Sequence, residues 1–157
     1  MHTILLFLAK DLIAVIGLAA FIYWLTLPKK LKIRIAVYGL ITAVVAYGLA
    51  KLGGSFFYDT RPFVTDHVTA LYPHGADNGF PSDHTLLSAV MAVTIFAASK
   101  KVGLALGVMA VLVGAARVIG HIHRPIDIAG SIVVAIIGGF VAAYLTATIQ
   151  TKYTASK

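Results

Sequence analysis

Residues 121–149 read HIHRPIDIAGSIVVAIIGGFVAAYLTATI, and this stretch decides the fold. The part from Ile126 to Ile149 holds one charged residue, Asp127, and is long enough for an α-helix to cross the hydrocarbon core of a bilayer. A long apolar run of this kind predicts a transmembrane helix. Histidines and an arginine stand directly before it, so a membrane span and a polar, titratable group meet at one point of the chain.

Further apolar runs precede this one, and their composition resembles it. They extend from Thr3 to Leu27, Leu31 to Leu52, Thr85 to Ala98 and Val102 to Ile119. The run after Thr85 is short, and it reaches spanning length if the helix begins at Ser82, behind Pro81. With 59% hydrophobic and 12% charged residues among 157, the sequence predicts an all-α integral membrane helix bundle of about five transmembrane helices in a single domain, residues 1–157.

The basic residues predict the orientation of the bundle. They gather in the first and third connections and near the C-terminus, at Lys29, Lys30, Lys32, Arg34, Lys100, Lys101, Lys152 and Lys157. Short basic loops stay on the cytoplasmic side of a membrane. We therefore expect the N-terminus, the long segment 53–81 and the turn 120–125 on the outer side. The N-terminal run lacks a basic leader and a small-residue cleavage site, so we expect a retained helix.

The formal charge of +7 and the absence of cysteine narrow the partners and the chemistry. Because the basic residues lie in short clusters between apolar runs, they favour anionic membrane lipid as a partner and not nucleic acid. Because the sequence contains no cysteine, it excludes disulfides, a thiol nucleophile and thiolate ligands to zinc. Lys10 and Asp11 interrupt the first apolar run, and we expect them to neutralise each other or to lie near the outer interface.

Three polar groups stand out because such residues are costly near a bilayer. They are Arg61-Pro62-Phe63, the Pro81-Ser82-Asp83-His84 segment, and Arg117 followed by His121, His123 and Asp127. Each has an ordinary explanation by itself, as an interfacial anchor, a helix cap or a helix-end hydrogen bond. The predicted topology brings all three to the outer membrane face, and this convergence indicates a site.

Two arginines, a hydroxyl group and free amides at a helix start form a receptor for a tetrahedral phosphate. His123 and Asp127 are four residues apart, so in a helical turn the carboxylate can hold one ring nitrogen and leave the other free to attack phosphorus. His84 can donate a proton to the departing oxygen, while Arg61 and Arg117 stabilise the transferred group. Residue chemistry alone does not choose between His121 and His123.

A zinc site is the alternative use of these side chains, because imidazole and carboxylate ligands suffice for a catalytic metal. A basic phosphate pocket needs no added cation, and His121-x-His123 is a weak metal signature, so we expect neither a metal nor another cofactor. The remaining histidines, His2, His67 and His74, are expected at the interface or in loops, without an assigned role.

The three groups resemble the type-2 phosphatidic acid phosphatase superfamily, whose pattern is a lysine with Arg-Pro, then Pro-Ser-x-His, then Ser-Arg-x5-His-x3-Asp. The resemblance covers roughly half of the chain and implies a metal-independent phosphatase. By this resemblance, His123 forms the phosphoenzyme, Asp127 orients His123, and His84 acts as the general acid. The implied phosphate-binding residues are Arg61, Ser82, Asp83 and Arg117, with Lys51 as a secondary candidate.

Two positions depart from the family pattern. Ala116 stands where the family has a serine before Arg117, and Gly54 stands where it has the lysine. Lys51 lies about one helical turn before Gly54. Its long side chain either reaches the phosphate or extends to the membrane interface.

Within the superfamily, the segments RPFV (61–64), PHGAD (73–77) and FPSDHT (80–85) resemble bacterial undecaprenyl pyrophosphate phosphatases of the BcrC type. The resemblance implies hydrolysis of undecaprenyl diphosphate at the outer face of the bacterial plasma membrane, which recycles the cell-wall lipid carrier and opposes bacitracin. The alternatives are phosphatidylglycerol phosphate, phosphatidate or a lipid A phosphate as substrate, or a noncatalytic transporter or lipid-binding bundle.

Overall fold

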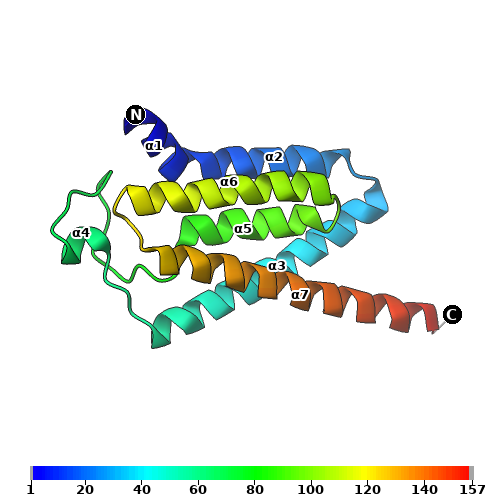
Figure 1. The fold of residues 1–157 in the computed structure, drawn as a ribbon. Helices are drawn as coiled ribbons and strands as arrows, with labels where there is room; N and C mark the ends of the chain where they lie inside the picture. The colour runs from blue at the N-terminus through cyan, green and yellow to red at the C-terminus, as the bar shows by residue number, and fades with distance from the viewer. Residues whose placement is uncertain (1, 156–157) are drawn as a thin grey trace.

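The protein is an elongated bundle of helices in a computed structural model that describes residues 2–155, with side chains described through residue 148 (Figure 1). Every apolar run of the sequence forms a helix over most of its length. The elements are α1 (His2–Leu6), the π-helical turn η1 (Phe7–Asp11), α2 (Leu12–Thr26), α3 (Lys29–Phe56), α4 (Pro62–Thr65), α5 (Asp83–Phe96), α6 (Lys100–Ile119) and α7 (Pro125–Ala155). The predicted all-α bundle is confirmed.

Four of the helical segments are long and apolar enough to cross a membrane, namely His2–Thr26, Lys29–Phe56, Lys100–Ile119 and Pro125–Thr148. The predicted third span corresponds to α5, which begins one residue after Ser82 but ends at Phe96. At about 1.5 Å per residue its 14 residues extend about 21 Å, short of the roughly 30 Å of a hydrocarbon core. α5 therefore starts inside the bundle, and the chain before it has to fill the remaining depth.

α5 is the central helix of the bundle. On one side its Ile95 packs with Leu12 and Ile16 of α2 and Leu106 of α6, and on the other its Leu86 belongs to a second cluster formed with α3 and α7. Phe96 lies directly against Gly103, where any side chain would overlap the Phe96 backbone, so the α5–α6 hairpin closes tightly. Surrounded by four other helices, α5 needs less lipid-facing length than they do.

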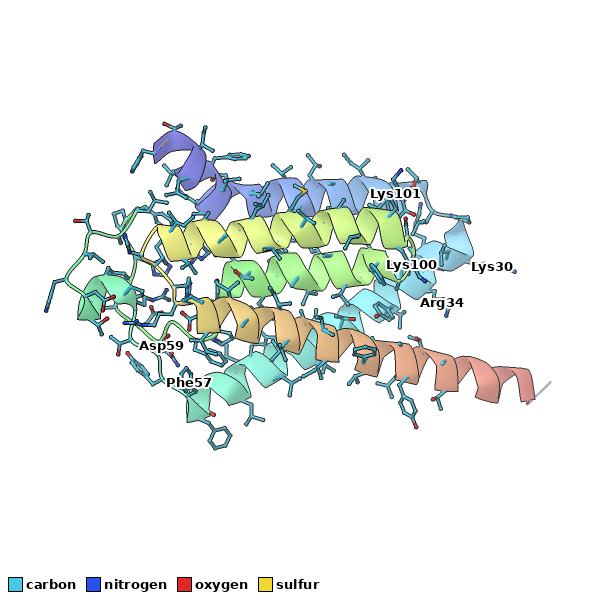
Figure 2. All side chains as sticks on the ribbon, viewed as in Figure 1. Lys30, Arg34, Phe57, Asp59, Lys100 and Lys101 are labelled. Carbon is cyan, nitrogen blue, oxygen red and sulfur yellow. The ribbon has the colours of Figure 1, made fainter. Side chains whose placement is uncertain are left out.

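The basic residues differ in detail from their predicted placement. The expected first connection is only two residues long, and Lys29, Lys30, Lys32 and Arg34 belong to the first turns of α3 behind Pro28. Figure 2 shows Lys30, Arg34, Lys100 and Lys101 together at one end of the bundle, opposite Phe57 and Asp59. The side chains of Lys152 and Lys157 lie outside the described residues.

The ionisable pair in the first apolar run does not neutralise itself, which was one of the two expectations for it. Lys10 and Asp11 lie in η1, both are exposed, and no ion pair joins them among the described side chains. The π-helical turn adds a residue to the helical repeat at this point. α1, which directly precedes this turn, lies at the same end of the bundle as the long loop (Figure 1).

Candidate active site

A pocket of about 510 Å³ opens at the end of the bundle where the long loop, α5 and the α6–α7 turn meet. Its charged residues and histidines come from all three predicted polar groups, from the loop and from α3. They are Lys51, Arg61, His74, Asp77, Asp83, His84, Arg117 and His123. The predicted convergence of the three groups is thus present in the structure, and most of the predicted site residues line one cavity.

His123 and Asp127 form a buried pair at the base of this pocket. His123 is 2% exposed and Asp127 is fully buried, and the Nδ1 of His123 lies 3.1 Å from Oδ2 of Asp127. The intervening turn is not helical, because α7 begins only at Pro125, so the pair forms across a helix start and not along one helix face. The backbone N–H of Arg124 donates to the same carboxylate oxygen at 2.9 Å and fixes it further.

Two guanidinium groups converge on the second ring nitrogen of His123. Arg61 Nη1 lies 3.2 Å and Arg117 Nη2 lies 3.1 Å from Nε2. Arginine only donates hydrogen bonds, so Nε2 has to accept and the ring proton has to reside on Nδ1, facing Asp127. The free electron pair of His123 therefore points into the pocket between two cations.

The structure also separates the two candidate histidines. His121 is exposed, has a positive φ of 57° and does not line the pocket, whereas His123 does. The left-handed backbone at His121 turns the chain sharply between α6 and α7. The turn thus directs His123 inward and His121 outward.

Arg117 is a buried charge with no acidic partner. It is 2% exposed, and within the described part of the chain no carboxylate lies within ion-pair distance of it. Its contacts are neutral: it donates to the Ala9 carbonyl at 3.1 Å and the Tyr72 hydroxyl at 2.7 Å. A buried cation is costly without a counter-charge, so we expect the site to attract an anion.

Arg61 is held differently, by the long loop. Its Nε donates to Asp77 Oδ1 at 2.9 Å, and its other nitrogens contact the carbonyls of Ile122 and Asn78. Because Asp77 is largely exposed, its charge is screened by solvent and neutralises Arg61 only in part. The Arg61 guanidinium beside Asp77 holds the pKa of that carboxyl below its usual value, although burial acts in the opposite direction.

The two imidazoles nearest the arginines are held in the neutral form. Burial is the largest cause that lowers the pKa of His123, and the charges of Arg117 and Arg61 add to it, while Asp127 acts in the opposite direction. Burial and the same two arginines lower the pKa of His74. Both rings are therefore uncharged near neutral pH and present nitrogen electron pairs to the guanidinium groups.

His74 and Tyr72 belong to the site although the sequence did not assign them. His74 Nε2 lies 3.3 Å from Arg117 Nη2, and its ring meets the ring of His123 edge-on at 6.2 Å between centroids. For Tyr72 the sequence signal was its position in the long polar loop, and for His74 it was also the PHGAD segment (73–77) of the family resemblance. Neither signal indicates where a side chain folds. The loop thus contributes a second neutral imidazole to the pocket.

Of the three predicted residues of the Pro-Ser-Asp-His segment, two line the pocket and one does not. Asp83 and His84 line the pocket. Ser82 is fully buried, makes no side-chain cap hydrogen bond, and accepts a hydrogen bond from Thr85 at 3.1 Å. Its carbonyl accepts from Ser131 of α7 at 2.9 Å, so Ser82 joins the starts of α5 and α7.

Lys51 lines the pocket from α3, with Nζ 5.1 Å from the centre of the Tyr47 ring. Gly54, at the position of the family lysine, lies against the loop. A Cβ there would come within 3.0 Å of the Phe80 carbonyl oxygen, so the loop packs too closely to leave room for a longer side chain without moving. The structure therefore places the lysine of this pocket one turn earlier.

No group of three or more histidine, cysteine, aspartate or glutamate side chains in the part of the chain that the structure describes is arranged to hold a metal ion. His84, His121 and His123, the ligands of the zinc alternative, do not form a cluster of this kind. The buried nitrogen of His123 faces two arginines.

Comparison with known families agrees with this arrangement. The family model described as the PAP2 superfamily matches residues 32–151. The chain belongs to this superfamily. Its matched segment contains every residue of the pocket named above.

Two curated relatives are similar over most of the chain. A Bacillus licheniformis protein named bacitracin transport permease protein BcrC is 36% identical over 130 residues, and Bacillus subtilis undecaprenyl-diphosphatase BcrC is 33% identical over 144 residues. These alignments cover 82% and 89% of this chain but 64% and 72% of the relatives. The chain thus spans about two thirds of the length of the curated relatives it matches.

A solved structure shares the fold. The crystal structure of Aquifex aeolicus LpxE matches with a TM-score of 0.60 and 19% identity, covering 90% of this chain and 93% of LpxE. The likeness extends over nearly the whole bundle and supports the helix order described above.

Orthophosphate should bind the pocket and stabilise the fold, because it supplies the counter-charge that Arg117 lacks. We expect the unfolding temperature in detergent to rise with phosphate concentration by mass action. Arg117→Lys should weaken binding about tenfold or more, since lysine lacks the planar fork. The exposed Arg34→Lys serves as a control and should keep the wild-type response. An equal phosphate-induced shift in both variants would contradict an anion site at Arg117.

Proposed function

We propose that the chain is a single-domain membrane phosphatase, residues 1–157, that hydrolyses undecaprenyl diphosphate to undecaprenyl phosphate and so recycles the cell-wall lipid carrier. The observation that carries the proposal is the pair of buried arginines at the free nitrogen of His123. Guanidinium groups at this spot recruit a phosphate and place its phosphorus before the nucleophile.

The first step is attack by the His123 Nε2 electron pair on the terminal phosphorus. The bond between this phosphorus and the bridging oxygen breaks, and undecaprenyl phosphate leaves with a proton supplied by His84, which takes up this proton when the negatively charged substrate binds beside it. Asp127 accepts the hydrogen bond from Nδ1 and stabilises the charge that the ring gains on forming phosphohistidine. Arg61 and Arg117 turn their hydrogen bonds from Nε2 to the phosphoryl oxygens.

The second step returns the enzyme to its starting state. A water molecule, deprotonated by the now neutral His84, attacks the phosphorus of phosphohistidine. The nitrogen–phosphorus bond breaks, inorganic phosphate leaves, and His123 regains its electron pair at Nε2. No metal or other cofactor is needed, because the two arginines supply the positive charge.

The other predicted residues have supporting roles in this mechanism. Lys51 contributes a third cation at the rim of the pocket. The Asp83 carboxylate and the substrate phosphate are both negatively charged and repel each other. Asp83 therefore contacts phosphate through its backbone N–H, in the first turn of α5. Ser82 is buried behind the lining, and its hydroxyl reaches phosphate only if the start of α5 adjusts on binding.

The shape of the surroundings supports a lipid diphosphate. An apolar groove of about 410 Å³ between α3 and α5 shares Tyr47, Lys51 and Asp83 with the phosphate pocket. A substrate with two phosphates and a long prenyl tail would fit this continuous path, with its inner phosphate beside Lys51. The name of the Bacillus subtilis relative points to the same substrate.

The name of the Bacillus licheniformis relative, a transport permease, represents the noncatalytic alternative. A transport path would carry polar groups along several spans. Here the polar groups of the pocket gather at one end of the bundle, and the spans below are apolar. The position of the reactive groups therefore favours catalysis.

The central test is phosphate release from undecaprenyl diphosphate by purified protein in detergent with excess chelator. We expect wild-type activity to resist chelation and His123→Ala to abolish it, because the nucleophile is lost. His121→Ala is the matched control: the side chain is exposed, lies outside the pocket and should leave the rate near that of the wild type.

Three outcomes would contradict the proposal in different ways. Activity lost on chelation would indicate a metal enzyme. A preference for the diphosphate of less than about tenfold over phosphatidylglycerol phosphate, phosphatidate or lipid A phosphate would undercut the carrier-recycling role. No release from any lipid phosphate would favour the transporter.

The pH profile should report the neutral state of His123. Only the unprotonated ring attacks, and burial lowers its pKa below the ordinary 6.5, so kcat/KM should persist as pH falls through 6.5 and decline only at lower pH. Asp127→Asn should move this decline further down, because Asp127 raises the pKa of His123, while also slowing the reaction. A decline at or above pH 6.5, or one that ignores Asp127→Asn, would contradict the assignment.

We further propose that the pocket faces the outer side of the bacterial plasma membrane. The basic ends of α3 and α6 lie at the opposite end of the bundle and favour the cytoplasm (Figure 2). Because the chain has no cysteine, Thr69→Cys in the long loop and Lys101→Cys give single labels. In intact cells an impermeant maleimide should label Thr69→Cys alone, and the reverse result would invert the topology.

A further inference from the structure

A second carboxyl group lies behind the His123–Asp127 pair. Asp59 lies in the loop after α3, at the site end of the bundle (Figure 2), and its side chain is 15% exposed. Oδ2 of Asp59 and Oδ1 of Asp127 are both buried, and neither has a hydrogen-bond partner when both groups are ionised. The two residues are neighbours: Asp59 Oδ1 lies 3.5 Å from Arg124 Nε, and Asp127 Oδ2 accepts from the Arg124 N–H at 2.9 Å.

The backbone holds Asp59 in this position. Its N–H donates to Asn78 Oδ1 at 3.0 Å, and its carbonyl accepts from the Gly79 N–H at 2.8 Å. Gly79 separates the two carboxyl-bearing segments: a Cβ there would come within 3.0 Å of Asp127 Oδ2 and 3.1 Å of the Asp59 carbonyl oxygen. The absence of a side chain at residue 79 allows the close approach of Asp59 to Asp127.

The other carboxyl oxygens already have partners. Asp127 Oδ2 accepts from His123 and from the Arg124 N–H, and Asp59 Oδ1 lies 3.5 Å from Arg124 Nε. This leaves Asp59 Oδ2 and Asp127 Oδ1 for each other. Ionised carboxylates only accept hydrogen bonds, so one proton has to lie between them for either oxygen to be satisfied.

We propose that Asp59 is a protonated positioning residue that donates its O–H to Asp127 Oδ1 and thereby holds the Asp127–His123 pair in line with the pocket. The proposal rests on the proposed phosphatase mechanism. Asp127 then has a hydrogen bond on each oxygen and cannot rotate about its side-chain bonds. The ring of His123 inherits this orientation, which keeps Nε2 directed at the incoming phosphorus.

The electrostatic surroundings assign the proton to Asp59. The charged groups that face Asp59 are Asp127, in the first turn of α7, and Arg124, directly before α7. Burial, the charge of Asp127 and the contact with its carboxylate raise the pKa of Asp59, while Arg124 lowers it. Asp127 Oδ2 faces Nδ1 of His123 at 3.1 Å, where the reaction places positive charge.

Asp59→Asn and Asp59→Ala separate the proposed role from a merely structural one. The amide of asparagine can donate the same hydrogen bond, so Asp59→Asn should keep kcat close to that of the wild type. Asp59→Ala should lower kcat about 10- to 100-fold with KM unchanged, as losses of supporting hydrogen bonds do elsewhere. Asp66→Asn is the matched control, because Asp66 also pairs with Arg124, at 3.3 Å, and is largely exposed.

An infrared measurement gives a readout independent of activity. At neutral pH the wild type should show the carbonyl stretch of a protonated carboxyl that disappears in Asp59→Asn and persists in Asp66→Asn. Absence of this band, equal damage by Asp59→Asn and Asp59→Ala, or a wild-type kcat in Asp59→Ala would each overturn the proposal. If the wild type releases no phosphate from any lipid, the proposed function fails, while the band still decides the protonation of Asp59.

Discussion

The buried guanidinium of Arg117 is the constraint on which the rest of the site depends. Arg117 is buried, and no carboxylate in the described part of the chain forms an ion pair with it. Such a charge destabilises the fold unless neutral hydrogen-bond acceptors and an anion compensate for it. The structure supplies the acceptors from distant segments: Ala9, Tyr72, His74 and His123. We propose that the substrate supplies the anion. One residue thus joins the N-terminal helix, the long loop and the α6–α7 turn.

The short central helix provides the space for this arrangement. Because α5 stops short of the bundle end while α3 and α6 continue, the segment 57–82 folds inward over its start. Irregular backbone is tolerated at such a depth where it is enclosed by protein or lines a wet cavity. The loop satisfies its own polar groups through residues such as Asn78, whose side chain contacts the backbone of Gly54, Phe57, Asp59 and Phe80. The pocket is therefore formed by a loop with many internal and helix contacts.

Individual residues show how far sequence reasoning reached. The helix runs and the three polar groups were visible because apolar length and isolated charge are local properties. The four-residue spacing of His123 and Asp127 predicted their contact, although a helix start and not a helical turn produces it. His74 was missed, because its contact with Arg117 joins residues 43 positions apart across a loop without periodicity. Asp59 was missed for the same reason.

The sequence by itself determined that the protein is a membrane protein, that it is all-helical, and which three polar groups are candidates for the site, since each follows from composition or from residues close in the chain. The tertiary structure decided which of these side chains share a cavity and what each faces. It placed Lys51 on the rim, Ser82 behind the lining and His121 outside. The physical reason is that hydrogen-bond partners and burial depend on how helices and loop pack, and packing joins residues that no local pattern connects.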